Sequence, residues 1–382
     1  MFNFDQVINR ANTDSLKWQK YAARDIIPLW IADTDFLSPP SIMKALQERV
    51  AEGVYGYGGQ PKELAKVFIN WADKHYNWQI RPEWLVFLPG LVTGLNISLR
   101  AFTNDSESSI CPFPIYPPFM AAAKHLNRKQ YYANLVNKNN RWVMDLNALE
   151  NKLDGHEKLL MLCNPQNPGG TVYSHEELLE QLAFAKQHNL IVCSDEIHCD
   201  LLLEPNLKHI PFASLNDEAA NCSITLMAPS KTFNIAGLGA SIAVIPNPQL
   251  RQKFMQTMED IVPHLNILAY TAAIAAYTDT SGWLAEQLAY LRNNRDYLYQ
   301  QINSIEGLKL LPIEASYLAW IDATQLPIEN PHRLFEEAGV GLSDGNDFGC
   351  DKFLRLNFGC PRILLEQAIE RMKIACSKLH NQ

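Results

Sequence analysis

The sequence predicts an α/β protein with a large, mostly parallel seven-stranded sheet and a smaller α+β part. From about residue 83, short apolar runs alternate with helical stretches, which is the pattern of a parallel sheet covered by helices on both faces. After about residue 280 this alternation gives way to a long charged helix and shorter strands. With 382 residues, of which 47 % are hydrophobic, the chain can bury a large core.

Seven segments of the first part have the composition of strands. Several are apolar without alternation, as expected for strands that are buried on both faces. Between the fourth and the fifth, Ser174 and Glu177 form a capping box that begins a helix, and Asn189 ends it, which completes a βαβ unit. The predicted strands are residues 84–88, 109–112, 130–134, 159–163, 190–195, 223–227 and 240–245.

The second part predicts a helix from residue 283 to about 302, followed by three short strands and a final helix. The strands are residues 308–311, 317–321 and 353–357. The final helix starts with Pro361, which favours a first helical turn. Its apolar stripe predicts that it docks on the rest of the chain, through Leu365, Ile369, Met372, Cys376 and Leu379.

The charge pattern favours a small-molecule partner. The chain has 33 lysine and arginine residues and 41 aspartate and glutamate residues, so its formal net charge is −8. It contains no run of basic residues that could bind nucleic acid or an anionic membrane. The uncharged stretch 261–278 contains Pro263, His264 and Asn266, so it predicts a buried helix, not a membrane span. Since the N-terminus lacks the features of a signal peptide, we expect a cytoplasmic protein.

The eight cysteines include no C-x-x-C pair, and most lie inside apolar runs. This distribution is typical of buried free thiols in a reducing compartment. Cys193, His198, Cys199 and Asp200 lie close together, but their spacing matches no zinc pattern. We therefore expect no metal site.

Three polar segments, residues 164–170, 194–198 and 228–234, each follow or end a predicted strand. Ligands of open α/β sheets bind at such strand ends. Taken singly, each segment also has a purely structural explanation. The first is a turn sequence, Asp195 suits a helix N-cap, and Lys231 suits a solvated position at a strand end.

Together the three segments supply what pyridoxal phosphate (PLP) requires. PLP needs a lysine for a Schiff base, a carboxylate beside its pyridine nitrogen and a donor to its phenolic oxygen. Lys231, Asp195 and Asn167 supply these groups in that order. The negative charge of Asp195 raises the pKa of the ring nitrogen and keeps it protonated, so that the ring can accept electrons.

At these motifs the chain resembles fold-type I PLP enzymes, the aspartate aminotransferase superfamily. Within it, the chain resembles the MalY/PatB branch of cystathionine β-lyases, or C–S lyases. This resemblance runs nearly end to end and implies a large domain of residues 45–280 and a small domain built from residues 1–44 and 281–382. The matching motifs are residues 12–18, 29–36, 54–57 and 353–361 together with the three segments above.

The resemblance implies a role for each matching residue. Lys231 is the Schiff-base lysine, Asp195 the pyridinium partner, and Tyr116 a catalytic residue that stacks on the ring. Arg355 holds the substrate α-carboxylate, and Ala32 and Tyr55 also belong to the substrate site. For Tyr55 the alternative is a position in a subunit interface without contact to the substrate. His198 is either a hydrogen-bonding neighbour of Asp195 or an ordinary buried histidine. Tyr57 reaches the cofactor of the neighbouring subunit in a homodimer. The remaining cofactor-binding residues are Asn167, Gly90, Leu91, Val92 and Ser230.

Two residues depart from the pattern of many relatives. Gly239 stands where the wider superfamily often has an arginine that pairs with the phosphate. Thr34 stands where many relatives have methionine, and the resemblance implies that this change alters the substrate pocket.

The implied activity is β-elimination from L-cystathionine or a related cysteine S-conjugate, which gives a thiol (homocysteine), pyruvate and ammonia in amino-acid metabolism. Lys231 removes the Cα proton as the general base. An aminotransferase remains the alternative, because the same residues serve both reactions. A regulatory protein-binding role, known in the MalY branch, is a further alternative by analogy only.

Overall fold

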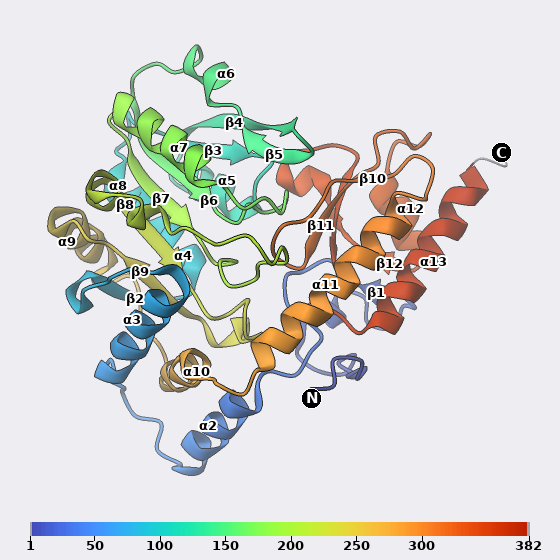
Figure 1. Ribbon diagram of the computed structural model, residues 1–382, viewed down its shortest axis with the longest axis horizontal. Helices are drawn as coiled ribbons and strands as arrows, with labels where there is room; N and C mark the ends of the chain where they lie inside the picture. Colours follow the sequence, from blue (N-terminus) through green and yellow to red (C-terminus); the bar gives the residue numbers. More distant parts are fainter. Residues whose placement is uncertain (1, 380–382) are drawn as a thin grey trace.

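The computed structural model describes residues 2–379 (Figure 1). Its largest element is an eight-stranded sheet with the strand order β2-β9-β8-β7-β6-β3-β4-β5. Neighbours from β8 to β4 are parallel, whereas β9 runs antiparallel to β2 and β8, and β5 antiparallel to β4. The strands are β2 (Leu85–Pro89), β3 (Ser108–Phe113), β4 (Lys129–Lys138), β5 (Arg141–Met144), β6 (Glu157–Cys163), β7 (Ile191–Asp195), β8 (Ser223–Met227) and β9 (Ala240–Val244).

The α/β fold class and the positions of all seven predicted strands are confirmed, but the strand count was wrong. The additional strand, β5, is a short edge strand joined to β4 by a tight turn at Asn139 and Asn140. Both asparagines have positive φ, 54° and 60°, as hairpin turns of this kind require. Because β5 is short and half-exposed, it lacks the continuous apolar run that marks the other strands.

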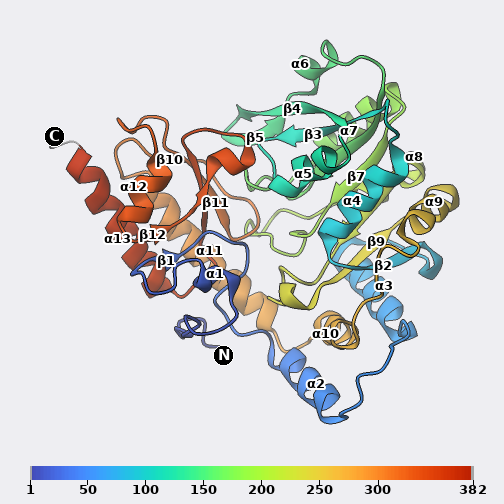
Figure 2. The same cartoon turned by 180° about the vertical axis from the view of Figure 1, so that it is seen from behind.

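Helices cover both faces of this sheet (Figures 1 and 2). One face packs on α4 (Leu91–Phe102), α5 (Pro117–His125) and α9 (Pro248–Met258). The other face packs on α6 (Leu146–Glu150), α7 (His175–Gln187) and α8 (Asp217–Cys222). The predicted capping box at the start of α7 is confirmed in both of its hydrogen bonds.

A second, four-stranded antiparallel sheet has the order β10-β11-β14-β13. The N-terminal segment lies beside it, because β1 (Ile27–Pro28) pairs with β12 (Val340–Gly341), as Figure 2 shows. The strands of the second sheet are β10 (Lys309–Leu310), β11 (Leu318–Asp322), β13 (Ser343–Asp344) and β14 (Phe353–Asn357), and its helices are α11 (Trp283–Ile302), α12 (Pro331–Glu337) and α13 (Arg362–Leu379).

A continuous apolar core joins the two sheets and also buries the predicted stripe of α13 at Leu365, Ile369, Met372 and Cys376. Of the uncharged stretch 261–278, residues 267–277 form α10 (Ile267–Tyr277), a mostly buried helix, whereas residues 261–266 lie outside the helix. None of the helices within residues 2–379 combines the length and apolar character needed to cross a bilayer. The remaining helices are α1 (Leu16–Gln19), α2 (Pro40–Ala51), α3 (Lys62–Tyr76) and the 3₁₀ turns η1 (Pro82–Trp84), η2 (Phe212–Ser214), η3 (Ala236–Leu238) and η4 (Gly345–Phe348).

We propose that the two sheets with their helices are the two predicted domains, residues 45–280 and residues 1–44 with 281–382. The predicted boundary at residue 44 falls inside α2.

Candidate active site

The three motif segments meet at one edge of the large sheet. β6, β7 and β8 are parallel and end at Cys163, Asp195 and Met227, so the segments that follow them lie side by side. A cavity of about 240 Å³ opens at this edge. It is lined by eleven of the predicted site residues: Ala32, Gly90, Leu91, Val92, Tyr116, Asn167, Asp195, His198, Ser230, Lys231 and Arg355.

Lys231 lies on the turn that follows β8. Its Nζ donates a hydrogen bond to the carbonyl oxygen of Ala32 at 2.6 Å. Burial lowers the pKa of Lys231 to about 8, and Arg355 acts in the same direction, while Asp33 and Asp195 oppose it. A lysine in this environment can lose its proton near neutral pH, which an amine needs in order to act as a nucleophile or base.

Asp195 is the last residue of β7 and is 3 % exposed. Its Oδ1 accepts a hydrogen bond from the backbone N–H of Ile197 at 3.1 Å. Burial raises the pKa of this carboxyl to about 7, and no cation of residues 2–379 forms an ion pair with it. A buried carboxylate without a cationic partner fits the protonated ring nitrogen of PLP.

Arg355 and Asn167 are joined by a hydrogen bond. Arg355 Nη1 donates to Asn167 Oδ1 at 3.1 Å, so the amide NH₂ of Asn167 remains a donor for a ligand oxygen. Arg355 Nη2 also donates to the carbonyl oxygen of Trp30 at 3.1 Å, and the guanidinium lies 4.6 Å from the ring centre of Phe348. Its buried Nε has no hydrogen-bond partner in the described part of the chain. This unsatisfied donor suits a carboxylate, which accepts bonds from two guanidinium nitrogens.

The N-terminus of α4 closes another side of the cavity. Gly90 is its N-cap, with a φ of 111°, and is followed by Leu91 and Val92 in the first turn. The first backbone N–H groups of a helix have no partner within the helix, and they attract phosphate. Ser230 adds a hydroxyl to the same cavity. The residues present therefore fit a phosphate group at this end.

Residues 24–372 match the model of a family described as aminotransferase class I and II. The chain belongs to this family. It is 36 % identical to the cystathionine beta-lyase PatB of Bacillus subtilis, over 98 % of this chain and 100 % of that protein. The solved structure of OvoB is 56 % identical, with a TM-score of 0.97 over 98 % of this chain and 99 % of that one. The PLP-bound C–S lyase of Staphylococcus hominis is 30 % identical, with a TM-score of 0.91 over 98 % of both chains.

These comparisons confirm the resemblance drawn from the motifs and its placement in the branch that contains PatB. They also confirm that this chain has the fold of fold-type I PLP enzymes.

In this member of the aminotransferase family, two aromatic residues border the cavity beside Asp195. Tyr116 precedes α5, and burial raises the pKa of its phenol. His198 is buried, and burial together with Lys231 and Arg355 lowers its pKa to about 3, so its imidazole is neutral. Of the two alternatives expected for His198, the hydrogen bond to Asp195 is not formed among the described residues: His198 Nδ1 has no partner, and Asp195 Oδ1 accepts from the backbone N–H of Ile197.

Tyr55 and Tyr57 do not reach the cavity of their own chain. Both lie in the segment between α2 and α3, and both side chains are exposed. The hydroxyl of Tyr55 donates to the carbonyl oxygen of Val50 at 2.7 Å. Their expected contacts with substrate and with a neighbouring subunit's cofactor stay predictions.

The two departures from the family pattern have different positions. Gly239 lines the cavity with a φ of 70°, a conformation that favours glycine. Thr34 is fully buried and does not line the cavity, so the expectation that it shapes the substrate pocket was wrong. Its backbone instead binds the side chain of Asn234.

The sequence did not predict two hydroxyl groups from the C-terminal part of the chain that contact Arg355 and Ala32. Ser343 Oγ lies 3.5 Å from Arg355 Nη2, and the hydroxyl of Tyr317 donates to the carbonyl oxygen of Ala32 at 3.1 Å. Neither residue lies in a motif. Only the packing of the second sheet against the first brings their hydroxyls within reach of Arg355 and Ala32.

Proposed function

We propose that this protein is a PLP-dependent carbon–sulfur β-lyase. Its substrate is L-cystathionine or a related cysteine S-conjugate, and its products are a thiol, pyruvate and ammonia; homocysteine is the thiol formed from cystathionine. The observation that carries the proposal is the cavity where Lys231, Asp195, Asn167 and Arg355 meet. The full-length similarity to a named cystathionine beta-lyase supports the choice of reaction.

The cofactor, when bound, supplies an acceptor for the electrons that the departing Cα proton leaves behind. Lys231 would hold it covalently and Asp195 would hold the proton on its ring nitrogen. Asn167 would donate to its phenolic oxygen, and Tyr116 would cover one face of its ring. Gly90, Leu91, Val92 and Ser230 would bind its phosphate, and buried His198 would border the ring as a neutral side chain.

Arg355 orients the substrate. Two guanidinium nitrogens can grip both oxygens of the α-carboxylate, which fixes the direction of the Cα–H bond. The contacts of Arg355 with Asn167 and Trp30 hold the guanidinium in one position before substrate arrives. Ala32 lies beside it in the cavity wall. Such preorganisation lowers the entropic cost of reaching a reactive geometry.

Lys231, once free of the cofactor, is the base for the Cα proton. Its pKa of about 8 leaves a fraction of the amine neutral at pH 7 and more above it. The protonated guanidinium of Arg355 cannot accept a proton, and His198, with a pKa of about 3, is a much weaker base than Lys231. Lys231 would then carry the proton taken from Cα and would donate it to the sulfur of the departing thiolate.

Incubation with L-cystathionine in the absence of any 2-oxo acid tests this function. We expect pyruvate and free thiol to accumulate in equal amounts, because elimination needs no amino acceptor. A matched incubation with added 2-oxo acid should leave the rate unchanged. Amino transfer that depends on the 2-oxo acid, without thiol release, would replace the lyase by an aminotransferase.

We further propose that the protein acts as a homodimer in the cytoplasm. The exposed tyrosines of the segment between α2 and α3 support a subunit interface there. All eight cysteines are free thiols, which suits a reducing compartment.

A further inference from the structure

The segment of residues 30–36, near the N-terminus, contacts the catalytic lysine through a hydrogen bond. At its centre, the carbonyl oxygen of Ala32 accepts hydrogen bonds from Lys231 Nζ at 2.6 Å and from the hydroxyl of Tyr317 at 3.1 Å. The family resemblance places Ala32 in the substrate site but assigns no function to its backbone carbonyl. Its position depends on what holds the segment in place.

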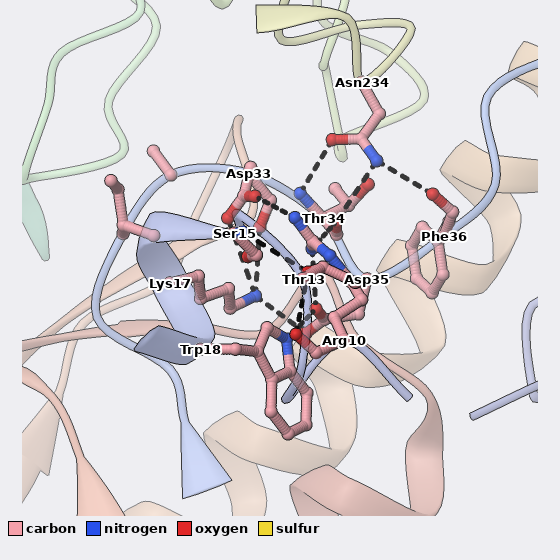
Figure 3. A network of polar contacts seen from close by, with 12 residues as sticks. Arg10, Thr13, Ser15, Lys17, Trp18, Asp33, Thr34, Asp35, Phe36 and Asn234 are labelled. Carbon is pink, nitrogen blue, oxygen red and sulfur yellow. Dashed lines mark hydrogen bonds and ion pairs between the residues drawn. The ribbon is translucent and has the colours of Figure 1, made fainter. Parts of the chain in front are cut away.

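Asn234 holds the segment from the side of the large sheet (Figure 3). Its Oδ1 accepts from the backbone N–H of Thr34 at 3.1 Å, and its Nδ2 donates to the carbonyl oxygens of Thr34 and Phe36 at 3.1 and 2.8 Å. Asn234 follows Lys231 by three residues in the same turn and has a φ of 56°. One turn therefore carries both the lysine and the side chain that fixes the lysine's acceptor.

A buried ion pair holds the same segment from the N-terminal side (Figure 3). Lys17 and Asp35 are 1 % and 2 % exposed, and Lys17 Nζ lies 2.7 Å from Asp35 Oδ2. Lys17 Nζ also donates to the carbonyl oxygen of Asp33, while Arg10 and Trp18 both donate to Asp35 Oδ1 at 3.1 Å. Removing two charges from water costs free energy that their attraction often does not recover. We therefore expect the pair to fix the geometry of the segment more than it stabilises the fold.

We propose that Asn234 and the Lys17–Asp35 pair are positioning residues: they hold the Ala32 carbonyl where it accepts a hydrogen bond from the free amine of Lys231. This inference rests on the proposed function and deepens it. When substrate has replaced Lys231 on the cofactor, the amine needs a fixed place from which to move the Cα proton. A hydrogen bond to Ala32 occupies one N–H and so limits the directions in which the lone pair can point.

The charged and titratable groups that face Lys231 come from several elements. Asp33 lies on the 30–36 segment and favours the ammonium form, as Asp195 at the end of β7 does. Arg355 from β14 opposes it, and His198 beside the cavity is neutral. Displacing the segment removes the Ala32 acceptor and moves Asp33 away. Both changes destabilise the ammonium, so the pKa of Lys231 should fall.

The substitution Asn234→Gly tests the proposal, because glycine accepts the positive φ but removes all three hydrogen bonds. Asn189→Gly is the matched control, since Asn189 has a φ of 51° and lies exposed at the end of α7. In the holoenzyme we expect Asn234→Gly to lower kcat about tenfold with KM within about twofold, because misplaced catalytic groups slow chemistry more than binding. Asn189→Gly should match the wild type.

A second readout does not depend on activity. After removal of the cofactor, acylation of Lys231 is followed by mass spectrometry as a function of pH. The wild-type midpoint is expected near pH 8, and that of Asn234→Gly at lower pH. A folded Asn234→Gly protein with an unchanged or higher midpoint would overturn the proposal. A wild type without lyase activity would overturn the proposed function instead, and the labelling would still decide the positioning role.

The double variant Lys17→Met/Asp35→Leu provides a test that does not depend on Asn234. It replaces the buried pair by apolar side chains of similar size, a change that folded proteins often tolerate. We expect the same loss of kcat and the same downward shift of the labelling midpoint. If this folded variant keeps both wild-type values, the ion pair has no positioning role and that part of the inference is wrong.

Discussion

Lys231→Ala is expected to abolish C–S cleavage, with a loss of at least about 10⁴-fold in kcat/KM. The variant loses both the covalent hold on the cofactor and the base for the Cα proton. It should also lose the visible absorption band of the bound cofactor. Activity and absorption spectra of the purified proteins measure both effects.

The control for this variant is Lys66→Ala, which removes a lysine from an exposed position on α3. It should keep the wild-type rate and spectrum. If Lys231→Ala retains the absorption band and the activity, another lysine holds the cofactor and the assignment is wrong.

Asp195→Asn is expected to lower kcat/KM by about 10²–10³-fold, the usual effect of removing one well-placed electrostatic contact in an active site. The amide cannot hold the ring nitrogen protonated by opposite charge, but it can still accept from Ile197 N–H. Affinity for the cofactor should fall as well. Asp351→Asn, at an exposed position, should leave both quantities unchanged.

The same substitution should stabilise the protein when the cofactor has been removed. The folded-state pKa of Asp195, about 7, lies above the value near 4 of an unfolded carboxyl. Between these values the folded state binds a proton that the unfolded state does not, so Asp195 makes the protein less stable as pH rises through this window.

At pH 8.5 the buried charge is fully present, and Asp195→Asn should raise the free energy of unfolding by roughly 2–4 kcal/mol. The advantage should shrink below about pH 5. Thermal unfolding at both pH values measures it. An equal or lower melting temperature for the variant at pH 8.5 would show that the Asp195 carboxylate has a compensating partner in the folded protein.

The sequence predicted the fold best where burial dictates residue type. Strands buried on both faces need continuous apolar runs, so β6, β7 and β8 could be placed from composition. The edge strand β5 pairs with a single neighbour and is only partly buried. Its residues therefore carry a weaker pattern, and only the turn at Asn139 and Asn140 marked it.

The site was predictable to the extent that its residues follow strands. Lys231, Asp195 and Asn167 meet because parallel strands end at one edge. Arg355 came from the family resemblance, since no local pattern links it to the large sheet. The contacts of Tyr317 and Asn234 with the 30–36 segment join residues far apart in sequence, and no spacing rule could have found them.

Errors at the site also have physical causes. Thr34 lies next to a cavity-lining segment in sequence, but its side chain is buried away from the cavity. His198 is near Asp195 in sequence, yet Asp195 Oδ1 accepts from a backbone N–H instead. Adjacency in sequence does not fix where a side chain points in a loop.

Borohydride reduction of the holoprotein tests the central claim most directly. Reduction makes the link between the cofactor and its lysine permanent, and mass spectrometry of proteolytic peptides then locates it. The structure predicts one cofactor-derived mass increment per chain, on the peptide that contains Lys231. An increment on a peptide with another lysine, or none in the wild type, would contradict the account.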